Sequence, residues 1–463
     1  MRIERIIASE YGAHLDSNVY TGKGTDDTEV LQQILDRADG ENVGVHLVMD
    51  GAALIKGLKL RSNTTIECLS KDCGFYLADN SDCPVVKNAD EIREGKVKQR
   101  NIRLIGGTYN QNCAHQIHSV KFDDDHGFFK NWGIPGFAPS CDYVVALRFV
   151  GVENLEIKDI VIRDQRTYAA LFANWKNITI ENTSIELPGR VHGQNQDGFH
   201  IFGPGQFLNM RNVRGCTSDD FIALAPDESD GKSSITDVLI DGVTLDDADQ
   251  AIRMLVHHKG LLDRVLIRNV TGTYRSYGFF INPFFNTGVD ENGGYGNITI
   301  ENVNLRSTAI DYDYTEPFLF RVGGHMRSLT LRNIEHYHPV DHRYLVDLGL
   351  QYYMDDVKKN SPTVIDSLTV DGLHTAENSP LSRDTDYIRV KDCTVKNLTI
   401  RNVNIERTEE VGTGGNLLSL VDSATVENLS VSSVSAQKLS GFIKCDKNST
   451  AENLTVNAVA IKK

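Results

Sequence analysis

The sequence predicts an all-β fold, a right-handed parallel β-helix built from a single chain, and three observations indicate it. A short motif recurs along most of the 463 residues, it alternates apolar and polar positions, and a second series of short apolar segments lies between its copies. Alternation with a period of two buries one face of a strand. Repeats of several short strands that stack on the next repeat are typical of a β-helix.

The first series has a polar residue, usually Asn, an apolar-x-apolar triplet, a turn residue and a second apolar pair. Residues 154–162 are a clear example, with Asp159 as the turn residue. Asn, Asp and Gly suit this place because they tolerate turns and left-handed backbone. The copies begin at Asn154, Asn177, Asp237, Arg264, Asn297, Ser328, Ser367, Asn397, Asn428 and Asn453, with weaker ones at Asn63 and Asn101.

The second series supplies a further strand in each repeat. Its members are residues 168–172, 198–202, 220–224, 250–254, 278–282, 317–321, 344–348, 386–390 and 441–445. Because no clear linker interrupts the two series, residues 1–463 are predicted to form a single domain.

Two regions depart from the repeat. Residues 1–60 are predicted to form an N-terminal cap region with a helix at about 28–38, because acidic residues precede apolar ones at helical spacing. Such a cap would cover the open end of the β-helix. Residues 110–142 lack the repeat and are predicted to form a long loop along a cleft.

Composition excludes several classes of partner. The net charge of −15 argues against nucleic acid or an anionic membrane, and no apolar run is as long as a membrane span. The N-terminus lacks the apolar core of a secretion signal, which predicts a cytoplasmic chain as written, or a secreted or periplasmic one if a leader has been removed. The eight cysteines lack zinc-ligand spacing. Cys68 and Cys73 are close enough for a local disulfide, but free thiols are favoured.

Two segments carry the chemistry. Residues 195–200 (Asn-Gln-Asp-Gly-Phe-His) and 218–224 (Ser-Asp-Asp-Phe-Ile-Ala-Leu) each place carboxylates before a strand, about one repeat apart. Segments one repeat apart lie side by side in a β-helix, so Asp197, Asp219 and Asp220 are predicted to share one site. Crowded carboxylates repel one another, which favours keeping one of them protonated.

These segments resemble those of the polygalacturonases, glycoside hydrolase family 28, in the pectin-lyase-like β-helix superfamily. Residues 195–201 are similar to the family's Asn-Thr-Asp-Gly-apolar-His/Asp-Ile segment, and residues 218–224 to its Gly-Asp-Asp-Cys-Ile-Ala-Ile. Residues 251–254 look like its Arg-Ile-Lys segment, and residues 11–28 look like the N-terminal cap of the superfamily. The resemblance covers roughly residues 10–310.

The resemblance implies an inverting glycoside hydrolase that cleaves a pectin-like or other polysaccharide or oligosaccharide. Asp219 would be the general acid, and Asp197 with Asp220 would orient the attacking water, with about 6.5–9.5 Å between acid and base. Neither a cofactor nor a metal is implied, the expected partner is a carbohydrate, and a homo-oligomer is left open. The expected substrate-binding residues are Asn195, His200, Arg253, His257 and Tyr277.

Departures from the family pattern leave alternatives open. No Gly-His-Gly segment is visible, and Leu255 stands where the family has the Lys of Arg-Ile-Lys, so a neutral or a different acidic sugar becomes plausible. A Ca²⁺-dependent polysaccharide lyase is one rival, because clustered carboxylates suit that cation. A non-catalytic, tailspike-like glycan-binding β-helix is another, and the three Asp residues would cap turns in a purely structural reading.

The binding candidates also have structural readings: Arg253 as a surface residue, His200 as a structural histidine, and His257 as part of a solvated turn. Aromatic residues are candidates for stacking on sugar rings or for the core. They are Trp132, Trp175, Tyr277, Phe284, Phe285 and Tyr295.

Overall fold

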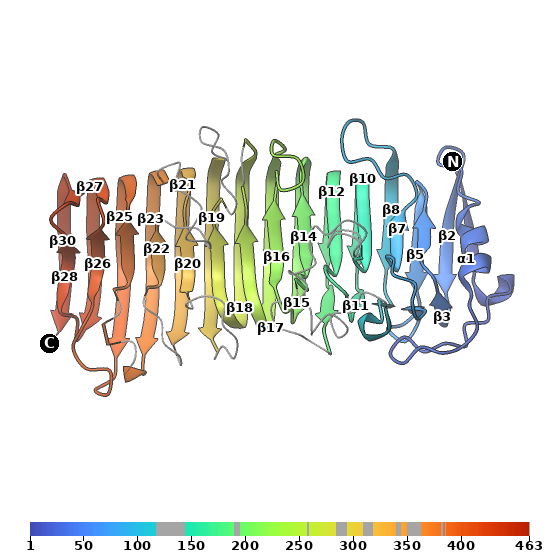
Figure 1. Cartoon of the computed structure of the whole chain (residues 1–463), viewed down its shortest axis with the longest axis horizontal. Coiled ribbons are helices and arrows are strands. Elements are labelled where there is room, and N and C mark those ends of the chain that lie inside the picture. Colours follow the sequence, from blue (N-terminus) through green and yellow to red (C-terminus); the bar gives the residue numbers. More distant parts are fainter. Residues whose placement is uncertain are drawn as a thin grey trace. The chain divides into compact units, whose positions relative to one another are not determined.

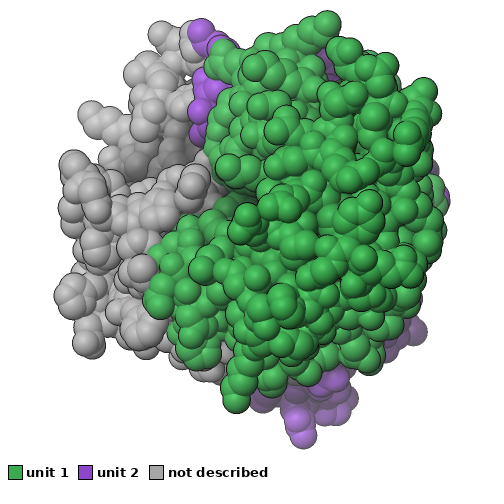
Figure 2. All heavy atoms as spheres, turned by 90° about the vertical axis from the view of Figure 1, so that its right-hand side faces the viewer, with its two compact units in different colours: residues 1–223 green, residues 224–463 purple. Residues whose placement is uncertain are grey.

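The computed structural model describes two compact units, residues 1–223 and residues 224–463, coloured separately in Figure 2. Each unit is described by itself, and the expectation of a single domain over residues 1–463 stays a prediction. The described residues are 1–116, 144–188, 195–256, 259–283, 294–308, 318–338, 344–349, 363–380, 383–384 and 386–462. The predicted loop at 110–142 therefore lies mostly outside them.

In the described part of the first unit there are one α-helix, two short 3₁₀ helices and the strands up to β16, within which the unit ends (Figure 1). The helices are α1 (Thr28–Leu35), η1 (Ser9–Tyr11) and η2 (Cys113–His115). The strands are β1 (Arg2–Ile7), β2 (Val43–Met49), β3 (Ala52–Ile55), β4 (Leu58–Leu60), β5 (Thr64–Cys68), β6 (Gly74–Leu77), β7 (Val86–Asn88), β8 (Gln99–Ile105), β9 (Thr108–Asn110), β10 (Leu147–Lys158), β11 (Val161–Arg163), β12 (Ala170–Glu181), β13 (Ser184–Glu186), β14 (Phe199–Phe202), β15 (Gly205–Gly215) and β16 (Asp220–Ala225).

Strands of the first unit stack in three ladders, as a β-helix requires. The first ladder runs through β1, β2, β5, β8, β10, β12 and β15, every pair of which is parallel. The second runs through β3, β6, β9, β11, β13 and the end of β15. The third runs through β4, β7, the starts of β10 and β12, then β14 and β16. The predicted all-β class and parallel β-helix are confirmed.

The helix α1 buries Leu31, Ile34 and Leu35 and contacts β2 and β4. It begins at the predicted residue but ends three residues early, at Leu35. The reason is local: the N–H groups of Arg37 and Ala38 donate to carbonyls three residues back, a 3₁₀ pattern that closes the last turn.

The strands of the second unit lie within its described residues. They are β17 (Ile235–Met254), β18 (Leu261–Ile281), β19 (Gly294–Ser307), β20 (Phe318–Val322), β21 (His325–His338), β22 (Val346–Leu348), β23 (Thr363–Glu377), β24 (Ile388–Lys391), β25 (Cys393–Arg407), β26 (Asn416–Val421), β27 (Thr425–Gln437), β28 (Gly441–Cys445), β29 (Thr450–Ala451) and β30 (Leu454–Lys462). Long strands β17, β18, β19, β21, β23, β25, β27 and β30 form one parallel ladder. The end of β18 and the short strands β20, β22, β24, β26 and β28 form another.

Apolar side chains in register form the core of the second unit. One continuous row joins seven consecutive long strands, and each of its members is at most 1% exposed. Its members are Ile240, Ile267, Ile300, Leu331, Val370, Ile400 and Val431. Each coil therefore buries the apolar face of the next, which is why the motif has to recur.

Asparagines at the turns form a second kind of row. Asn154 Nδ2 donates to Asn101 Oδ1 at 3.1 Å, and Asn177 Nδ2 donates to Asn154 Oδ1 at 2.9 Å. All three have left-handed backbone, with φ between 57° and 59°. The leading asparagines of the motif thus have left-handed backbone, as the mid-motif Asp159 also has (φ 58°), and their amides link one coil to the next.

Two expectations from composition can be compared with the structure. Cys68 and Cys73 are both free and buried, so the alternative of a local disulfide is wrong. Burial raises the pKa of the Cys68 thiol well above its usual range. Within the described parts of the chain, no helix is long and apolar enough to cross a membrane.

Candidate functional site

The two carboxylate-bearing segments lie in adjacent coils of the first unit. The N–H of Gly198 donates to the Asp220 carbonyl at 2.8 Å, and the N–H of Ala170 donates to the Gly198 carbonyl at 2.9 Å. Ala170 bonds to the residue just before its partner, because it pairs with Phe199. The bond from Gly198 to Asp220 has the same pattern, so Gly198 pairs with Phe221. Asp197 therefore lies opposite Asp220. Paired strand residues are about 4.8 Å apart. We call residues 195–198 and 217–220 the carboxylate site.

The three carboxylates of this site differ in exposure. Asp197 is 2% and Asp220 is 5% exposed, whereas Asp219 is half-buried. The Asp220 N–H donates to Asp219 Oδ1 at 2.9 Å, and the Thr217 hydroxyl donates to the Asp219 carbonyl at 2.8 Å. These bonds hold the Asp219 side chain at the start of β16. Asp219 is thus the most accessible of the three to a molecule from solvent.

His200 contacts Asp197 directly. Its Nδ1 lies 2.6 Å from Asp197 Oδ2, and both side chains are nearly inaccessible. The imidazole stacks on Tyr168 with centroids 4.1 Å apart and an interplanar angle of 12°, and it leans against Phe202 at 4.6 Å. An imidazole held between two rings has one orientation, so its N–H can fix the carboxylate of Asp197 in one rotamer.

Amide side chains tie the two segments together beneath the carboxylates. Ser218 Oγ donates to Gln196 Oε1 at 2.9 Å, and Gln196 Nε2 donates to the Gln165 carbonyl at 3.0 Å. Gln165 Nε2 in turn donates to the Asp197 carbonyl at 3.2 Å. All three of these side chains are fully buried. Three successive coils are therefore cross-linked at this place by hydrogen bonds that water cannot replace.

At Gly198 the backbone of the Asp197 segment lies very close to the backbone of β16. A Cβ at this residue would lie 2.3 Å from the Phe221 carbonyl oxygen and 2.8 Å from Ile185 Cδ1. A glycine is therefore required for the Asp197 segment to lie this near to β16.

Asn195 lies at the edge of the site, half-buried and with left-handed backbone (φ 56°). Its Nδ2 donates to the Tyr168 hydroxyl at 3.3 Å. Arg166, two residues before Tyr168, is only 1% exposed, and its backbone N–H donates to Gln111 Oε1 at 2.8 Å. Thus the coil before the carboxylate site contributes a stacking ring and a buried guanidinium group.

Sequence reasoning missed the supporting residues of the site, which are Tyr168, Gln165, Gln196 and Ser218. A signal existed for the first two, because residues 165–168 precede a strand of the second series as residues 195–198 do. No pattern in the sequence singles out Gln196 or Ser218, whose role depends on the hydrogen bonds between coils.

The remaining predicted binding residues belong to the second unit. Arg253, at the end of β17, is 5% exposed; its guanidinium carbon lies 4.5 Å from the Phe280 ring centroid, and its Nη1 donates to the Tyr277 hydroxyl at 3.1 Å. Tyr277 is fully buried, stacks on Phe318 with centroids 5.1 Å apart, and donates to Gln250 Oε1. The roles of both in substrate binding stay predictions. His257 lies outside the described residues.

Like Tyr277, two further aromatic candidates for sugar stacking are core residues. Trp175 is 3% exposed and its indole N–H donates to the Phe202 carbonyl at 2.9 Å. Tyr295 is 2% exposed and its hydroxyl donates to the Met254 carbonyl at 3.0 Å, while burial raises the pKa of that hydroxyl. Trp132, Phe284 and Phe285 lie outside the described residues.

Metal binding was a rival interpretation of the carboxylates. Over the residues with a described position, no group of three or more His, Cys, Asp or Glu side chains is arranged to hold a metal ion.

Comparison with known proteins identifies the class of fold. The family 28 exopolygalacturonase of Yersinia enterocolitica matches with a TM-score of 0.51 at 15% identity, covering 100% of this chain and 79% of that one. A mutant tailspike protein of E. coli bacteriophage HK620, in complex with a hexasaccharide, matches with a TM-score of 0.62 at 11% identity, covering 98% and 80%. The A-module of a mannuronan C-5 epimerase from Azotobacter vinelandii matches with a TM-score of 0.51 at 13% identity, covering 97% and 100%.

These likenesses concern the fold. They confirm the predicted structural resemblance to family 28 polygalacturonases and other pectin-lyase-like β-helices. No protein-family model matches the sequence, and no curated protein matches it. The chain has a parallel β-helix fold.

Proposed function

We propose that this protein is an inverting glycoside hydrolase that cleaves a polysaccharide or oligosaccharide. One observation carries the proposal: Asp197 stands opposite Asp220 in adjacent coils, and Asp219 is next to Asp220 in the chain. Glycoside hydrolysis requires a carboxylic acid that protonates the leaving oxygen and a carboxylate that activates water. The site supplies carboxyl groups from two adjacent coils, and inversion requires about 6.5–9.5 Å between the carboxyls of Asp219 and Asp197.

Asp219 is assigned as the general acid. It is the half-buried member of the three and therefore the one that a glycosidic oxygen can approach from solvent. In the proposed reaction Asp219 would give its proton to the leaving glycosidic oxygen.

Asp197 and Asp220 are assigned to the attacking water. Both are buried, and both belong to segments cross-linked by Ser218 and Gln196. His200 acts as a positioning residue, because its ring is fixed by Tyr168 and contacts Asp197 Oδ2. A fixed base lowers the entropic cost of aligning water with the anomeric carbon.

The substrate class is a pectin-like or other polysaccharide. Support comes from the named activities of proteins with the same fold, which include an exopolygalacturonase and a mannuronan epimerase. Leu255, where the Lys of Arg-Ile-Lys is expected, favours a sugar other than galacturonate at that subsite.

The test is reducing-end release from a panel of pectic and neutral polysaccharides. Wild-type protein should release reducing ends from at least one of them, and Asp219→Asn and Asp197→Asn should abolish most of the release. Full hydrolysis by both variants would overturn the assignment. Products that absorb ultraviolet light, with activity lost in a chelator, would instead identify a Ca²⁺-dependent lyase.

A second candidate is a non-catalytic glycan-binding β-helix. It is favoured by the tailspike match, whose TM-score of 0.62 exceeds the 0.51 of the Yersinia exopolygalacturonase. In that case oligosaccharides would bind and no polysaccharide of the panel would release reducing ends.

A further inference from the structure

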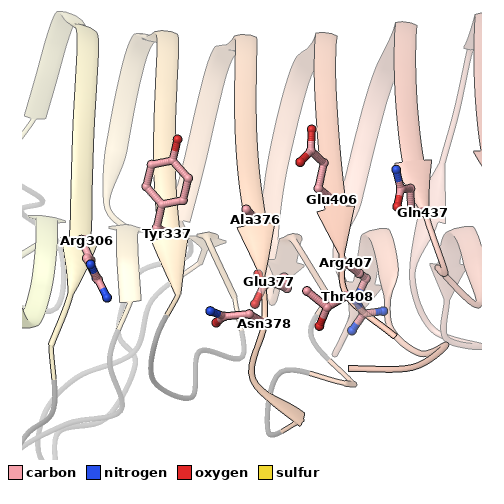
Figure 3. A pocket seen from close by; sticks show the side chains of 9 residues that line it. All are labelled: Arg306, Tyr337, Ala376, Glu377, Asn378, Glu406, Arg407, Thr408 and Gln437. Carbon is pink, nitrogen blue, oxygen red and sulfur yellow. The ribbon is translucent and has the colours of Figure 1, made fainter. Parts of the chain in front are cut away.

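A hollow of about 390 Å³ lies on the outer side of five consecutive long strands of the second unit (Figure 3). Arg306, Tyr337, Ala376 and Glu406 are paired in register from β19 to β25, and Gln437 ends the next strand, β27. They therefore form one row across the coils. We call this row and the hollow over it the outer groove.

One residue of the row, Ala376, has a much shorter side chain than its neighbours. Ala376 stands between Tyr337 on one neighbouring strand and Glu406 on the other. The longer side chains on both sides form walls and Ala376 forms a low point between them, as Figure 3 shows. Five strands spaced about 4.8 Å apart make the row about 19 Å long, which suits a chain-like ligand.

The lining of the outer groove consists of the aromatic ring of Tyr337, the methyl group of Ala376 and otherwise polar or charged side chains. Tyr337 is 40% exposed. Glu406 Oε1 accepts a hydrogen bond from Asn404 Nδ2 at 3.0 Å and lies 3.5 Å from His374 Nε2, so its carboxylate is held in place. Asn378, Thr408 and Gln437 add amide and hydroxyl groups that both donate and accept hydrogen bonds.

Beneath the row the groove has a charged but rigid floor. Glu377 and Arg407 pair in register and are 1% and 4% exposed. Arg407 Nη1 donates to the Gly414 carbonyl at 2.6 Å and to the Lys438 carbonyl at 3.0 Å. The guanidinium group thus fixes the turns on which the groove rests, and a preformed site loses little entropy on binding.

Charge balance separates the classes of ligand. The lining contains two carboxylates, Glu377 and Glu406, and two guanidinium groups, Arg306 and Arg407, so its formal charges cancel. A net charge of −15 on the whole chain disfavours polyanions. A sugar chain without charge matches such a lining, because its hydroxyl groups both donate and accept and its ring face packs on an aromatic side chain.

We propose that the outer groove binds a neutral oligosaccharide chain. It consists entirely of residues of the second unit, contains none of the residues of the carboxylate site, and is proposed as a binding site without chemistry. The proposal does not depend on the protein being a hydrolase.

Binding is measured by titration calorimetry with cellohexaose, xylohexaose, mannohexaose and, as the acidic comparison, hexagalacturonate. The protein carries Asp219→Asn so that no ligand is consumed. We expect at least one neutral hexamer to bind, Tyr337→Ala to weaken its binding about threefold to tenfold, and Tyr337→Phe to change it little. Ala376→Phe, which fills the low point, should abolish it.

Tyr11→Ala is the matched control, since Tyr11 is a 49% exposed tyrosine of the first unit. The proposal would be overturned if Tyr337→Ala and Ala376→Phe bound the neutral hexamers as tightly as the parent protein does, with unchanged thermal unfolding. It would also be overturned if only hexagalacturonate bound, or if no hexamer bound. Failure of the proposed hydrolysis is a separate result, because reducing-end release by the unmodified protein does not enter this measurement.

Discussion

The carboxylate site of the first unit and the outer groove of the second unit present polar side chains in opposite ways. In the carboxylate site, Asp219 and Asp220 are consecutive, and the groups beneath them are buried and cross-linked through Gln196 and Ser218. In the outer groove, one residue from each strand forms an exposed row, and the core lies beneath it. Coils of the same type can thus bury polar groups in a hydrogen-bonded cluster or present them in a row on the surface.

The difference predicts how each region responds to substitution. Changes at the buried residues of the carboxylate site, such as Asp197 and Gln196, should affect activity and folding together, because these residues share partners. At the half-buried Asp219 a change should affect activity alone. Changes in the exposed row of the outer groove, such as Tyr337, should affect binding with little effect on folding, because these side chains are exposed to solvent.

The largest expected effect is on catalysis. Asp219→Asn should lower the rate of reducing-end release about 10²- to 10⁴-fold, the usual contribution of a general acid, with little change in thermal unfolding. Asp72→Asn, an exposed carboxylate of the same unit, is the control and should retain the full rate. If Asp219→Asn lowered the rate of reducing-end release less than threefold, the proposal that the carboxylate site carries catalysis would be wrong.

His200→Phe tests the positioning of Asp197. The substitution keeps an aromatic ring against Tyr168 but removes the N–H that can donate to Asp197. A hydrogen bond to a charged group contributes about 1.5–3 kcal/mol, so the rate should fall about 10- to 100-fold. Steady-state rates and the melting temperature should be measured together. If only the melting temperature fell, His200 would be a structural residue of the core.

Gly198→Ala tests whether close packing maintains the carboxylate site. The added Cβ would lie 2.3 Å from the Phe221 carbonyl oxygen, and the resulting displacement should lower the free energy of unfolding by about 1–3 kcal/mol. Denaturant unfolding gives this value. Gly294→Ala is the control, because the nearest atom to its Cβ is Leu261 Cδ1 at 3.7 Å. Equal stability of the two variants would contradict the prediction.

The smallest expected effect concerns the frame of the outer groove and depends on pH. Asp371, on the strand that carries Ala376, accepts a hydrogen bond from Arg401 Nη2 at 2.8 Å, and this bond, together with one from Asn402, lowers the pKa of the carboxyl below its usual value. Asp371→Asn should therefore reduce stability at pH 7 by about 0.2–1 kcal/mol, the range for exposed ion pairs.

The sign follows from linkage. A carboxyl whose pKa is lower in the folded chain stabilises the fold above its unfolded pKa of about 3.9, and this contribution is lost as the pH falls through the folded value. Urea unfolding of wild type and Asp371→Asn at pH 7 and pH 3 should thus show a difference that shrinks in acid. A difference that is the same at both pH values would exclude the ion pair as its cause.

Much of the fold was predictable because its rule is local. The recurring apolar pairs predict strands, and in the structure Ile240, Ile267 and Ile300 stack in one buried row. The end of α1 was less predictable, since the 3₁₀ closure at Ala38 replaces the last helical turn. The adjacency of Asp197 and Asp220 also followed from their spacing, because in a β-helix a separation of one repeat is a separation of one coil.

The amino-acid sequence by itself determined that the chain forms a parallel β-helix, because each repeat can bury its apolar face only by stacking on the next repeat. It also determined that Asp197 lies one coil away from Asp219 and Asp220. Only the tertiary structure decided what surrounds them: the ring of Tyr168 against His200, the amide links of Gln165 and Gln196, and the burial of Tyr277. It also decided that Ala376 is a low point in a row of longer side chains. These contacts join residues of different coils, and a side chain's neighbours across coils depend on register and rotamer, which no local pattern encodes.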